Sequence, residues 1–370
     1  MTTPDGPAAD AVAETIRLRS ALDLLPVYVP GRPAPDDGAV RYKVSSNESP
    51  WGPVPAVRDA VVAAVDGLNR YPDMGAAALR AELAAEHRVA PEQIALSTGS
   101  VAVTGDLVRA LVDQGDEVVF AWRSFEAYPI LVGSHGGTSV AVPLTDGLEH
   151  DLPAMAAAVT DRTRLVILCT PNNPTGPVLT TEQIEDFCDR VPQHVVIAID
   201  EAYREFVEPE LAPDTARIFA ERGNVVLLRT FSKVHGIAGL RIGYAVAHPR
   251  LASALSQVTL PFGASSLAQA AALACLGPAA RAELSERAGL IRAERSRVLA
   301  GLREQGWNVP DAQGNFVYLP LGDESAAFAA FADERGLVVR AYGTDGVRIT
   351  IAETEANDRS LEVAGEWLTR

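Results

Sequence analysis

Short, almost wholly apolar runs recur along the first two thirds of the chain, separated by longer segments in which apolar residues return every three or four positions. Apolar runs without polar alternation are typical of strands buried on both faces, and the longer segments are typical of amphipathic helices. We predict strands at 94–96, 117–120, 139–142, 164–169, 194–199 and 224–229. Their alternation with helices predicts an α/β fold with a largely parallel central sheet.

Helical periodicity also precedes and follows this region. It covers 54–68 and 76–87, with a polar interruption between them at 69–73. A longer helical pattern at 265–304 breaks at Gly277-Pro278, because these two residues interrupt helices.

The last part of the chain predicts a second, smaller α/β unit. Its strands are expected at 313–319, 337–340 and 347–351, and its helix at 326–335. Residues 1–15 are expected to form a frayed arm. The predicted organisation is an N-terminal arm and small-domain segment at 1–50, a large domain at 51–262 and a small C-terminal domain at 263–370.

Polar or small residues follow most of the predicted strands, where open α/β sheets place their ligands. Asp200 directly follows one apolar run, and the sequence 97–100 (Ser-Thr-Gly-Ser) leads from another strand into a helix. A helix start offers free N–H groups to a phosphate, but the same residues also serve as ordinary N-caps. Asp200 could likewise cap a helix or face a ligand. The chain has no GxGxxG and no P-loop, so a nucleotide site lacks its usual motif.

The most informative stretch follows the run at 224–229 and reads TFSKVHGIAGLRIGY, residues 230–244. Lys233 stands beside Ser232, with Gly236 and Gly239 next and Arg241 eight residues on. Burial and neighbouring cations lower the pKa of a lysine, and its neutral amine can then attack a carbonyl. Glycine lets the backbone approach a ligand, and arginine grips phosphate. The stretch therefore predicts a reactive amine beside a bound phosphate.

Composition narrows the class of protein. The chain has 370 residues, 48% of them hydrophobic, and a net charge of −16 from 32 basic and 48 acidic side chains, which argues against a nucleic-acid partner. No apolar run approaches the roughly 18 residues of a membrane-spanning helix, and the first ten residues lack a signal pattern. Three cysteines without redox or metal spacing, and six scattered histidines, predict a cytoplasmic protein without a metal site.

The stretch 230–244 resembles the pyridoxal-phosphate lysine motif of aminotransferases, in the branch that holds the histidinol-phosphate and aromatic amino acid enzymes. The similarity extends from Leu25 to Trp367. It implies an aspartate-aminotransferase-like fold (PLP fold type I), pyridoxal 5'-phosphate as cofactor, and a homodimer with shared active sites. His235, Ser49, Trp51 and Thr170 depart from the residues usual in the family.

The resemblance also implies roles for residues on the cofactor side. Lys233 would bind the cofactor covalently, and Asp200 would pair with the nitrogen of its ring. Tyr203 and Asn173 would share the phenolic oxygen, and Phe125, which could equally be a core residue, would stack on the ring. Residues implied to hold the phosphate are Gly99, Ser100, Val101, Ser232, Arg241 and, from the partner subunit, the residue equivalent to Tyr71.

On the substrate side the resemblance implies an anion clamp at Arg348, with Arg340 assisting. Taken alone, Arg348 reads as a solvated or ion-paired arginine of a strand. The other residues expected at the substrate are Tyr28, Asn47, Asn173 and Asn315. The two arginines fit either a carboxylate or a phosphate, so charge alone does not choose between an aromatic substrate and histidinol phosphate.

These features favour a ping-pong transaminase that moves an amino group between an aromatic L-amino acid and a 2-oxo acid, in amino-acid biosynthesis. The sequences of residues 122–126 and 342–346 resemble those of the phenylalanine-type branch. The alternative is histidinol-phosphate aminotransferase. A lyase or decarboxylase would share Lys233 and Asp200, since the cofactor carries the chemistry. A regulator on the same fold would need a DNA-binding module, for which the first 50 residues leave little room.

Overall fold

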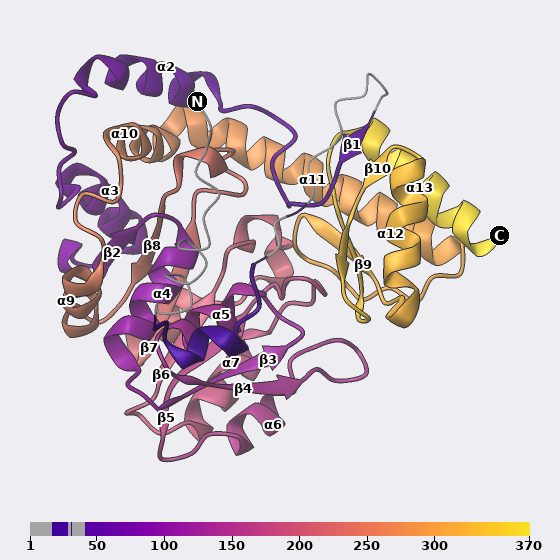
Figure 1. Ribbon diagram of the computed structural model, residues 1–370. Helices are drawn as coiled ribbons and strands as arrows, with labels where there is room; N and C mark the ends of the chain where they lie inside the picture. Colours follow the sequence, from indigo (N-terminus) through magenta and orange to yellow (C-terminus); the bar gives the residue numbers. More distant parts are fainter. Residues whose placement is uncertain (1–16, 29–30, 32–40) are drawn as a thin grey trace, which may run out of the picture.

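The computed structural model describes residues 17–28, 31 and 41–370, and the predicted arm at 1–15 lies outside this part of the chain. The described residues form a large α/β unit and a smaller one (Figure 1). Helix α11 (Pro278–Glu304) runs from one unit to the other. Its first half contributes Leu284 to the core of the large unit, and its second half contributes Val298 to the core of the small one. The predicted boundary at 262/263 remains a prediction.

A seven-stranded sheet, ordered β2-β8-β7-β6-β5-β3-β4, forms the centre of the large unit. All neighbouring strands are parallel except β8, which is antiparallel to both of its neighbours. The six strands predicted in this region are confirmed within one to two residues at each end. The bounds are β2 Ile94–Ser97, β3 Glu117–Trp122, β4 Thr138–Pro143, β5 Thr163–Cys169, β6 Val196–Asp200, β7 Val225–Thr230 and β8 Gly243–Val246.

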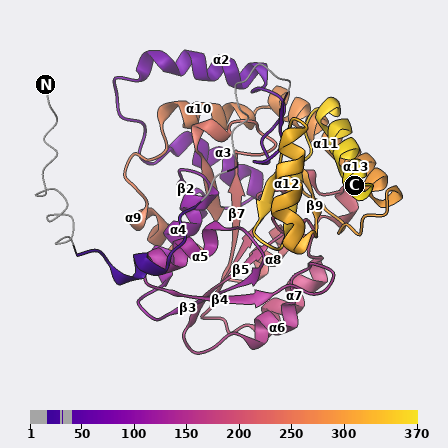
Figure 2. The same ribbon diagram turned by 45° about the vertical axis from the view of Figure 1, so that its right-hand side comes forward.

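Successive side chains of these strands enter two different cores, because neighbouring residues of a strand point to opposite faces. Val119 and Ile197 belong to one hydrophobic cluster, and Val118 and Ala198 to the other. The first cluster includes side chains from α2 (Pro55–Ala64), α3 (Ala77–His87), α6 (Leu152–Ala157), α7 (Thr181–Arg190), α8 (Thr215–Glu221) and α10 (Ser266–Cys275). The second includes α4 (Ser100–Leu111), α5 (Ala127–Ser134) and α9 (Pro249–Val258). Figure 2 shows this layered arrangement from a second side.

The small unit contains a three-stranded antiparallel sheet in the order β11-β12-β9. A separate parallel pair joins β1, from the beginning of the described chain, to β10 near its end. Helices α11, α12 and α13 also contribute to its core, as do Tyr203, Phe206 and Val234 from the chain of the large unit. The bounds are β1 Tyr42–Lys43, β9 Phe316–Leu319, β10 Leu337–Val338, β11 Arg340–Tyr342, β12 Gly346–Thr350, α12 Ser325–Glu334 and α13 Thr354–Leu368.

One predicted strand was wrong, and some elements were not predicted. The run 337–340 is not a single strand, because Leu337–Val338 pairs with β1 whereas Arg340–Tyr342 pairs with β12. Its apolar character reflects burial in the small-unit core, which both pieces share. The short strand β8 and helix α9 were not predicted from the sequence.

Candidate active site

Lys233 lies three residues beyond the end of β7, in a cavity at the carboxyl edge of the central sheet. Its Nζ donates a hydrogen bond to the Asn47 carbonyl oxygen at 3.3 Å and lies 5.3 Å from the centre of the Tyr203 ring. Burial, together with the positive charges of Arg348 and Arg241, lowers the pKa of this amine to about 7. A large fraction of Lys233 is therefore neutral near pH 7 and able to act as a nucleophile.

Asp200 is the last residue of β6 and is 5% exposed. Its Oδ2 accepts a hydrogen bond from the Tyr128 hydroxyl at 2.7 Å, and its Oδ1 accepts one from the Ala202 N–H at 3.2 Å. Burial raises the pKa of Asp200, while these hydrogen bonds oppose the rise. Both donors are neutral, so the carboxylate has no ion pair within 4 Å in the described chain. A cationic group of a ligand would supply its missing partner.

A cradle for an anion surrounds the start of α4. Gly99 has a φ of 97°, and a Cβ at this position would lie 2.5 Å from Nη2 of Arg241. A Cβ on Gly243 would lie 2.4 Å from the Ser100 nitrogen. Arg241 itself donates from Nη1 to the Ser232 Oγ at 3.2 Å. Glycine at positions 99 and 243 lets the backbone and the Arg241 guanidinium come this close together. No side chain caps the start of α4, so its N–H groups can bind an anion.

The wall between the cradle and Asp200 is aromatic and amide-bearing. Phe125 lines the cavity and meets Tyr128 edge-on, with ring centres 5.6 Å apart. Tyr203 accepts a hydrogen bond from Asn47 Nδ2 at 3.1 Å and packs on Phe316. Burial raises the pKa of the Tyr203 phenol, so its hydroxyl stays protonated and can donate. The residues that line the cavity are Ser100, Val101, Phe125, Cys169, Asn173, Asp200, Ala202, Tyr203, Thr230, Ser232, Lys233 and Arg241.

These groups match the phosphate, ring and carbonyl of pyridoxal 5'-phosphate. The cradle offers N–H groups and a guanidinium to the phosphate, and Asp200 offers a carboxylate to the ring nitrogen. Lys233 offers a neutral amine to the carbonyl. The cofactor-side residues implied by the resemblance therefore line one cavity, with two exceptions: Gly99, which adjoins it beside Arg241, and Tyr71.

Arg348, on β12, is 6% exposed and points toward this cavity's amide wall. Its Nη1 donates to Asn173 Oδ1 at 2.6 Å and its Nη2 to the Ser45 carbonyl oxygen at 2.7 Å. Its Nε is buried without a hydrogen-bond partner in the described chain. Both acceptors are neutral, so the expectation of a solvated or ion-paired strand arginine is wrong. Arg348 keeps its full positive charge for a substrate anion.

Arg340 stands directly opposite Arg348 in the register of β11 and β12. Unlike Arg348, it forms an ion pair, from its Nη2 to Glu126 Oε2 at 2.6 Å. The ring of Tyr342 lies beside both guanidinium groups, at 5.5 Å from Arg340 and 5.6 Å from Arg348. The two arginines thus lie on one face of the sheet. A carboxylate pairs with Arg340, whereas the acceptors of Arg348 are neutral.

Residues 42–363 match the family model for aminotransferase class I and II. The chain belongs to this family. Its members depend on pyridoxal 5'-phosphate, and the chain is accordingly a pyridoxal-phosphate-dependent aminotransferase.

Similar proteins agree with this assignment. The aromatic amino acid aminotransferase of Streptomyces avermitilis is 51% identical over 347 residues, which cover 94% of this chain and 96% of the relative. The Thermobifida fusca protein of the same name is 48% identical, with coverage of 95% and 98%. Among solved structures, Sinorhizobium meliloti histidinol-phosphate aminotransferase in complex with pyridoxal-5'-phosphate has a TM-score of 0.80 at 30% identity, covering 88% of this chain and 90% of that one. A tetra mutant of Thermus thermophilus aspartate aminotransferase has a TM-score of 0.78 at 25% identity, covering 87% and 95%. The aspartate-aminotransferase-like fold is confirmed.

In this aminotransferase the remaining predicted substrate residues lie at different depths. Asn315 is buried and donates from Nδ2 to the Asn47 carbonyl oxygen at 3.3 Å, and its Oδ1 has no partner in the described chain. Asn47 is buried as well and has a φ of 53°. Tyr28 is 46% exposed, so its own chain leaves it largely open to solvent.

Tyr71 does not enter the cavity of its own chain. It is 83% exposed and stacks on Phe262 with ring centres 4.8 Å apart. Met74 and Leu260 are also exposed large apolar residues. An aromatic pair among exposed apolar side chains is typical of a protein interface. The role of Tyr71 at a partner's site stays a prediction.

Two departures from the family pattern are accommodated locally. The His235 ring packs against Phe231, with centres 4.6 Å apart, and burial lowers its pKa to about 4, so it remains neutral like the aromatic residue it replaces. Trp51 lies outside the catalytic cavity, with the Arg287 guanidinium 5.6 Å from its ring centre.

Three residues at or near the site, Tyr128, Glu126 and Cys169, were not predicted from the sequence. Tyr128 and Glu126 follow and precede α5's first residue, near the predicted Phe125, which was the only signal available. Burial raises the pKa of Cys169 to about 12, so its thiol is unreactive. Among described residues, no three His, Cys, Asp or Glu side chains are grouped to hold a metal. No described helix is long and apolar enough to cross a membrane.

Proposed function

We propose that this aminotransferase moves the amino group of aromatic L-amino acids to a 2-oxo acid, as a homodimer with shared active sites. The observation that carries the substrate assignment is the ion pair between Arg340 and Glu126. It leaves Arg348 as the guanidinium with no carboxylate partner at the substrate end. One positive charge suits the single carboxylate of an aromatic amino acid. A phosphate monoester carries close to two negative charges near pH 7 and calls for more.

The relatives support the same substrate class. Those at about 50% identity over nearly the full chain are named aromatic amino acid aminotransferases. The structural neighbour named for histidinol phosphate is more distant, at 30% identity.

Binding and orientation follow from the side chains of the site. Arg348 would hold the substrate carboxylate, and Asn173 fixes its guanidinium through the 2.6 Å hydrogen bond. The Gly99–Val101 turn, Ser232 and Arg241 would hold the cofactor phosphate. Asp200 would hold the ring nitrogen protonated, and Tyr128 keeps that carboxylate in place. Phe125 would cover one ring face.

Proton transfer is assigned to Lys233. When bound, pyridoxal 5'-phosphate supplies a carbonyl that captures the amino group and a ring that accepts the electron pair released at the α-carbon. With a pKa of about 7, the Lys233 amine is partly neutral near pH 7 and can take up the α-proton and return it. Tyr203 keeps its proton and would donate to the phenolic oxygen. Phe125 and Tyr203, which line the cavity, would shield the reacting atoms from water.

The dimer proposal starts from Tyr71. Its exposed ring and its exposed neighbours Phe262, Leu260 and Met74 form an apolar surface that a second copy of the chain would cover. Tyr71 would then reach the phosphate in the partner's cavity. We also infer a cytoplasmic location and a role in amino-acid biosynthesis.

The substrate assignment is tested by a competition of donors. We expect kcat/KM for L-phenylalanine and L-tyrosine, with 2-oxoglutarate as common acceptor, to exceed that for histidinol phosphate by at least about tenfold, a difference of roughly 1.4 kcal/mol. A clear preference for histidinol phosphate would overturn the aromatic assignment and keep the transaminase. Glutamate formed in equal amounts with the new oxo acid separates transfer from a lyase or decarboxylase reaction.

A further inference from the structure

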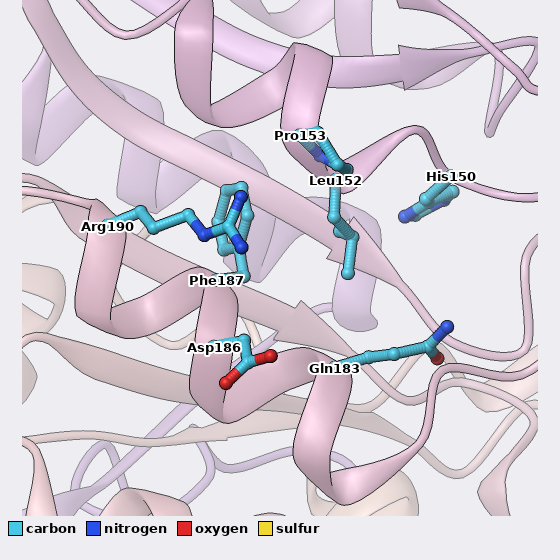
Figure 3. Close-up of a pocket in the computed structure, with 7 residues that line it drawn as sticks. All are labelled: His150, Leu152, Pro153, Gln183, Asp186, Phe187 and Arg190. Atoms are coloured by element: carbon cyan, nitrogen blue, oxygen red, sulfur yellow. The ribbon is translucent and has the colours of Figure 1, made fainter.

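A second cavity, of about 250 Å³, lies between helices α6 and α7, apart from the catalytic one (Figure 3). Leu152, Pro153 and Phe187 form its apolar surface, and His150 closes one end. Typical small-molecule sites begin at roughly 300 Å³. A cavity of this size therefore suits a single amino acid better than a nucleotide.

The hydrogen bonds around His150 determine which of its nitrogens is protonated. Asn172 donates from Nδ2 to the Arg123 carbonyl oxygen at 3.1 Å, and a carbonyl can only accept, so the amide orientation is fixed. Asn172 Oδ1 then faces His150 Nε2 at 3.3 Å, and Nε2 must be the donor. Burial lowers the pKa of His150 to about 4, so the ring is neutral and Nδ1 carries no proton.

His150 Nδ1 is thus a buried acceptor without a donor in the described chain. His150 is 7% exposed, and Figure 3 shows its ring turned toward the space between Leu152 and Gln183. A buried acceptor of this kind costs free energy unless a ligand or water supplies a donor. The far end of the cavity therefore selects for an O–H or N–H group.

The mouth of the cavity is lined by charged and polar side chains. Asp186 and Arg190 lie one turn apart on α7, and the described residues offer neither of them an ion pair. Gln183 uses its Oε1 to accept from the Thr180 N–H, at 2.8 Å, which leaves its Nε2 free to donate. A carboxylate and a guanidinium side by side match the ammonium and carboxylate of a zwitterion.

We propose that this cavity is a second, non-catalytic binding site for an aromatic amino acid that carries a hydrogen-bond donor on its ring, of which tyrosine is the simplest. Arg190 holds the α-carboxylate and Asp186 the α-ammonium. The ring lies against Phe187 and Leu152, and its hydroxyl donates to His150 Nδ1.

The site is connected to the catalytic cavity through two adjacent residues. His150 donates to Asn172, and the next residue, Asn173, accepts from Arg348 at the substrate end. Asn172 Oδ1 also accepts from Ser124, the neighbour of Phe125, at 2.7 Å. The proposal does not rest on the catalytic function, because none of its ligand contacts belongs to the catalytic cavity.

Calorimetric titration of the holoenzyme, reduced with borohydride so that it cannot turn over, tests the site with L-tyrosine and with L-phenylalanine, a control that lacks only the ring hydroxyl. We expect one equivalent of L-tyrosine per chain whose affinity falls at least about tenfold in Arg190→Gln and in Asp186→Asn, as the loss of one charge-assisted hydrogen bond predicts. Arg250→Gln removes an exposed arginine on α9 and serves as the matched control, with binding unchanged. L-phenylalanine should bind this equivalent about 2- to 10-fold more weakly than L-tyrosine.

His150→Phe adds an internal control, because it removes the acceptor and should abolish the preference for L-tyrosine. Equal titrations of wild type, Arg190→Gln and Asp186→Asn would overturn the proposal. Equal affinities for L-tyrosine and L-phenylalanine in the wild type would also overturn it, and this comparison requires no variant to fold.

Discussion

Two small groups of charged side chains flank the active site, and they differ in whether each charge has an opposite partner. Arg340 and Glu126 neutralise each other in an ion pair. Asp200 and Arg348 are buried, and each is held by neutral hydrogen-bonding groups alone. A buried charge without an opposite charge is costly, so it persists where a ligand completes it. In this enzyme a charged side chain with an oppositely charged partner is structural, and one without such a partner is functional. Its position in the sheet distinguishes the two kinds less well.

The strongest test of this comparison uses two adjacent carboxylates, Asp200 and Glu201. Glu201 is bonded to Arg204 and Arg229, at 2.8 and 2.7 Å. We expect Asp200→Asn to lower kcat by about 10³-fold or more, roughly 4 kcal/mol of transition-state stabilisation, while the protein stays folded.

Glu201→Gln should do the reverse. Removing one partner of a buried ion pair destabilises a protein by about 3–5 kcal/mol, so the midpoint of urea unfolding should fall. Turnover per folded molecule should change much less than in Asp200→Asn. Equal losses of kcat in both variants would remove the distinction between the two carboxylates.

A second test compares the two arginines. Arg348→Met should lower kcat/KM for L-phenylalanine by about 10²- to 10³-fold, because the substrate carboxylate loses its charged, bidentate partner. Arg340→Met should lower it by less than about tenfold, because that guanidinium already serves Glu126. Steady-state kinetics of both variants provide the measurement. A larger loss in Arg340→Met would show that the roles are exchanged.

Glu126→Gln sharpens the comparison by removing the carboxylate that pairs with Arg340. Without this negative charge beside Arg340, kcat/KM for histidinol phosphate should rise by about tenfold, roughly one charge-assisted hydrogen bond, with little change for L-phenylalanine. The ratio of the two substrates in wild type and variant is the readout. An unchanged ratio would mean that Arg340 does not reach the substrate.

The smallest expected effect concerns pH. The pKa of Lys233 is lowered to about 7, and only the neutral amine attacks a carbonyl. The rate at which the apoenzyme captures pyridoxal 5'-phosphate should therefore rise about tenfold per unit below pH 7 and level off above it. Arg348 is one of the cations that lower this pKa, so Arg348→Met should move the midpoint upward. A profile without a midpoint between about pH 6 and 8 in the wild type would contradict the assignment.

Much of the fold was predictable from local pattern. Strands such as 164–169 and 194–199 are buried on both faces and read as continuous apolar runs, and polar residues at their ends marked the site. Lys233 and Asp200 could be predicted because both stand at or just beyond the C-terminal end of such a strand. The division of 337–340 between two sheets could not, because Leu337 pairs with Tyr42, which is far away in the sequence.

The contacts that distinguish functional from structural side chains were not predictable either, because they join residues that are far apart in the sequence. Tyr128 reaches Asp200 across 72 residues, and Glu126 reaches Arg340 across 214. Both contacts depend on the order of strands and on how the small unit packs on the large one. A side chain's partner is a property of the tertiary structure, so the sequence alone did not show that Arg340 pairs with a carboxylate and Arg348 does not.

The most direct test of the central claim makes use of an unusual composition, since Lys43 and Lys233 are the chain's two lysines. Lys43 is bonded to Glu48 at 2.6 Å on the surface and serves as an internal control. Borohydride reduction of the holoenzyme, followed by peptide mapping, should place the pyridoxyl group on Lys233 in about one copy per chain and leave Lys43 unlabelled. A label on Lys43, or the absence of a label in an active enzyme, would contradict the account.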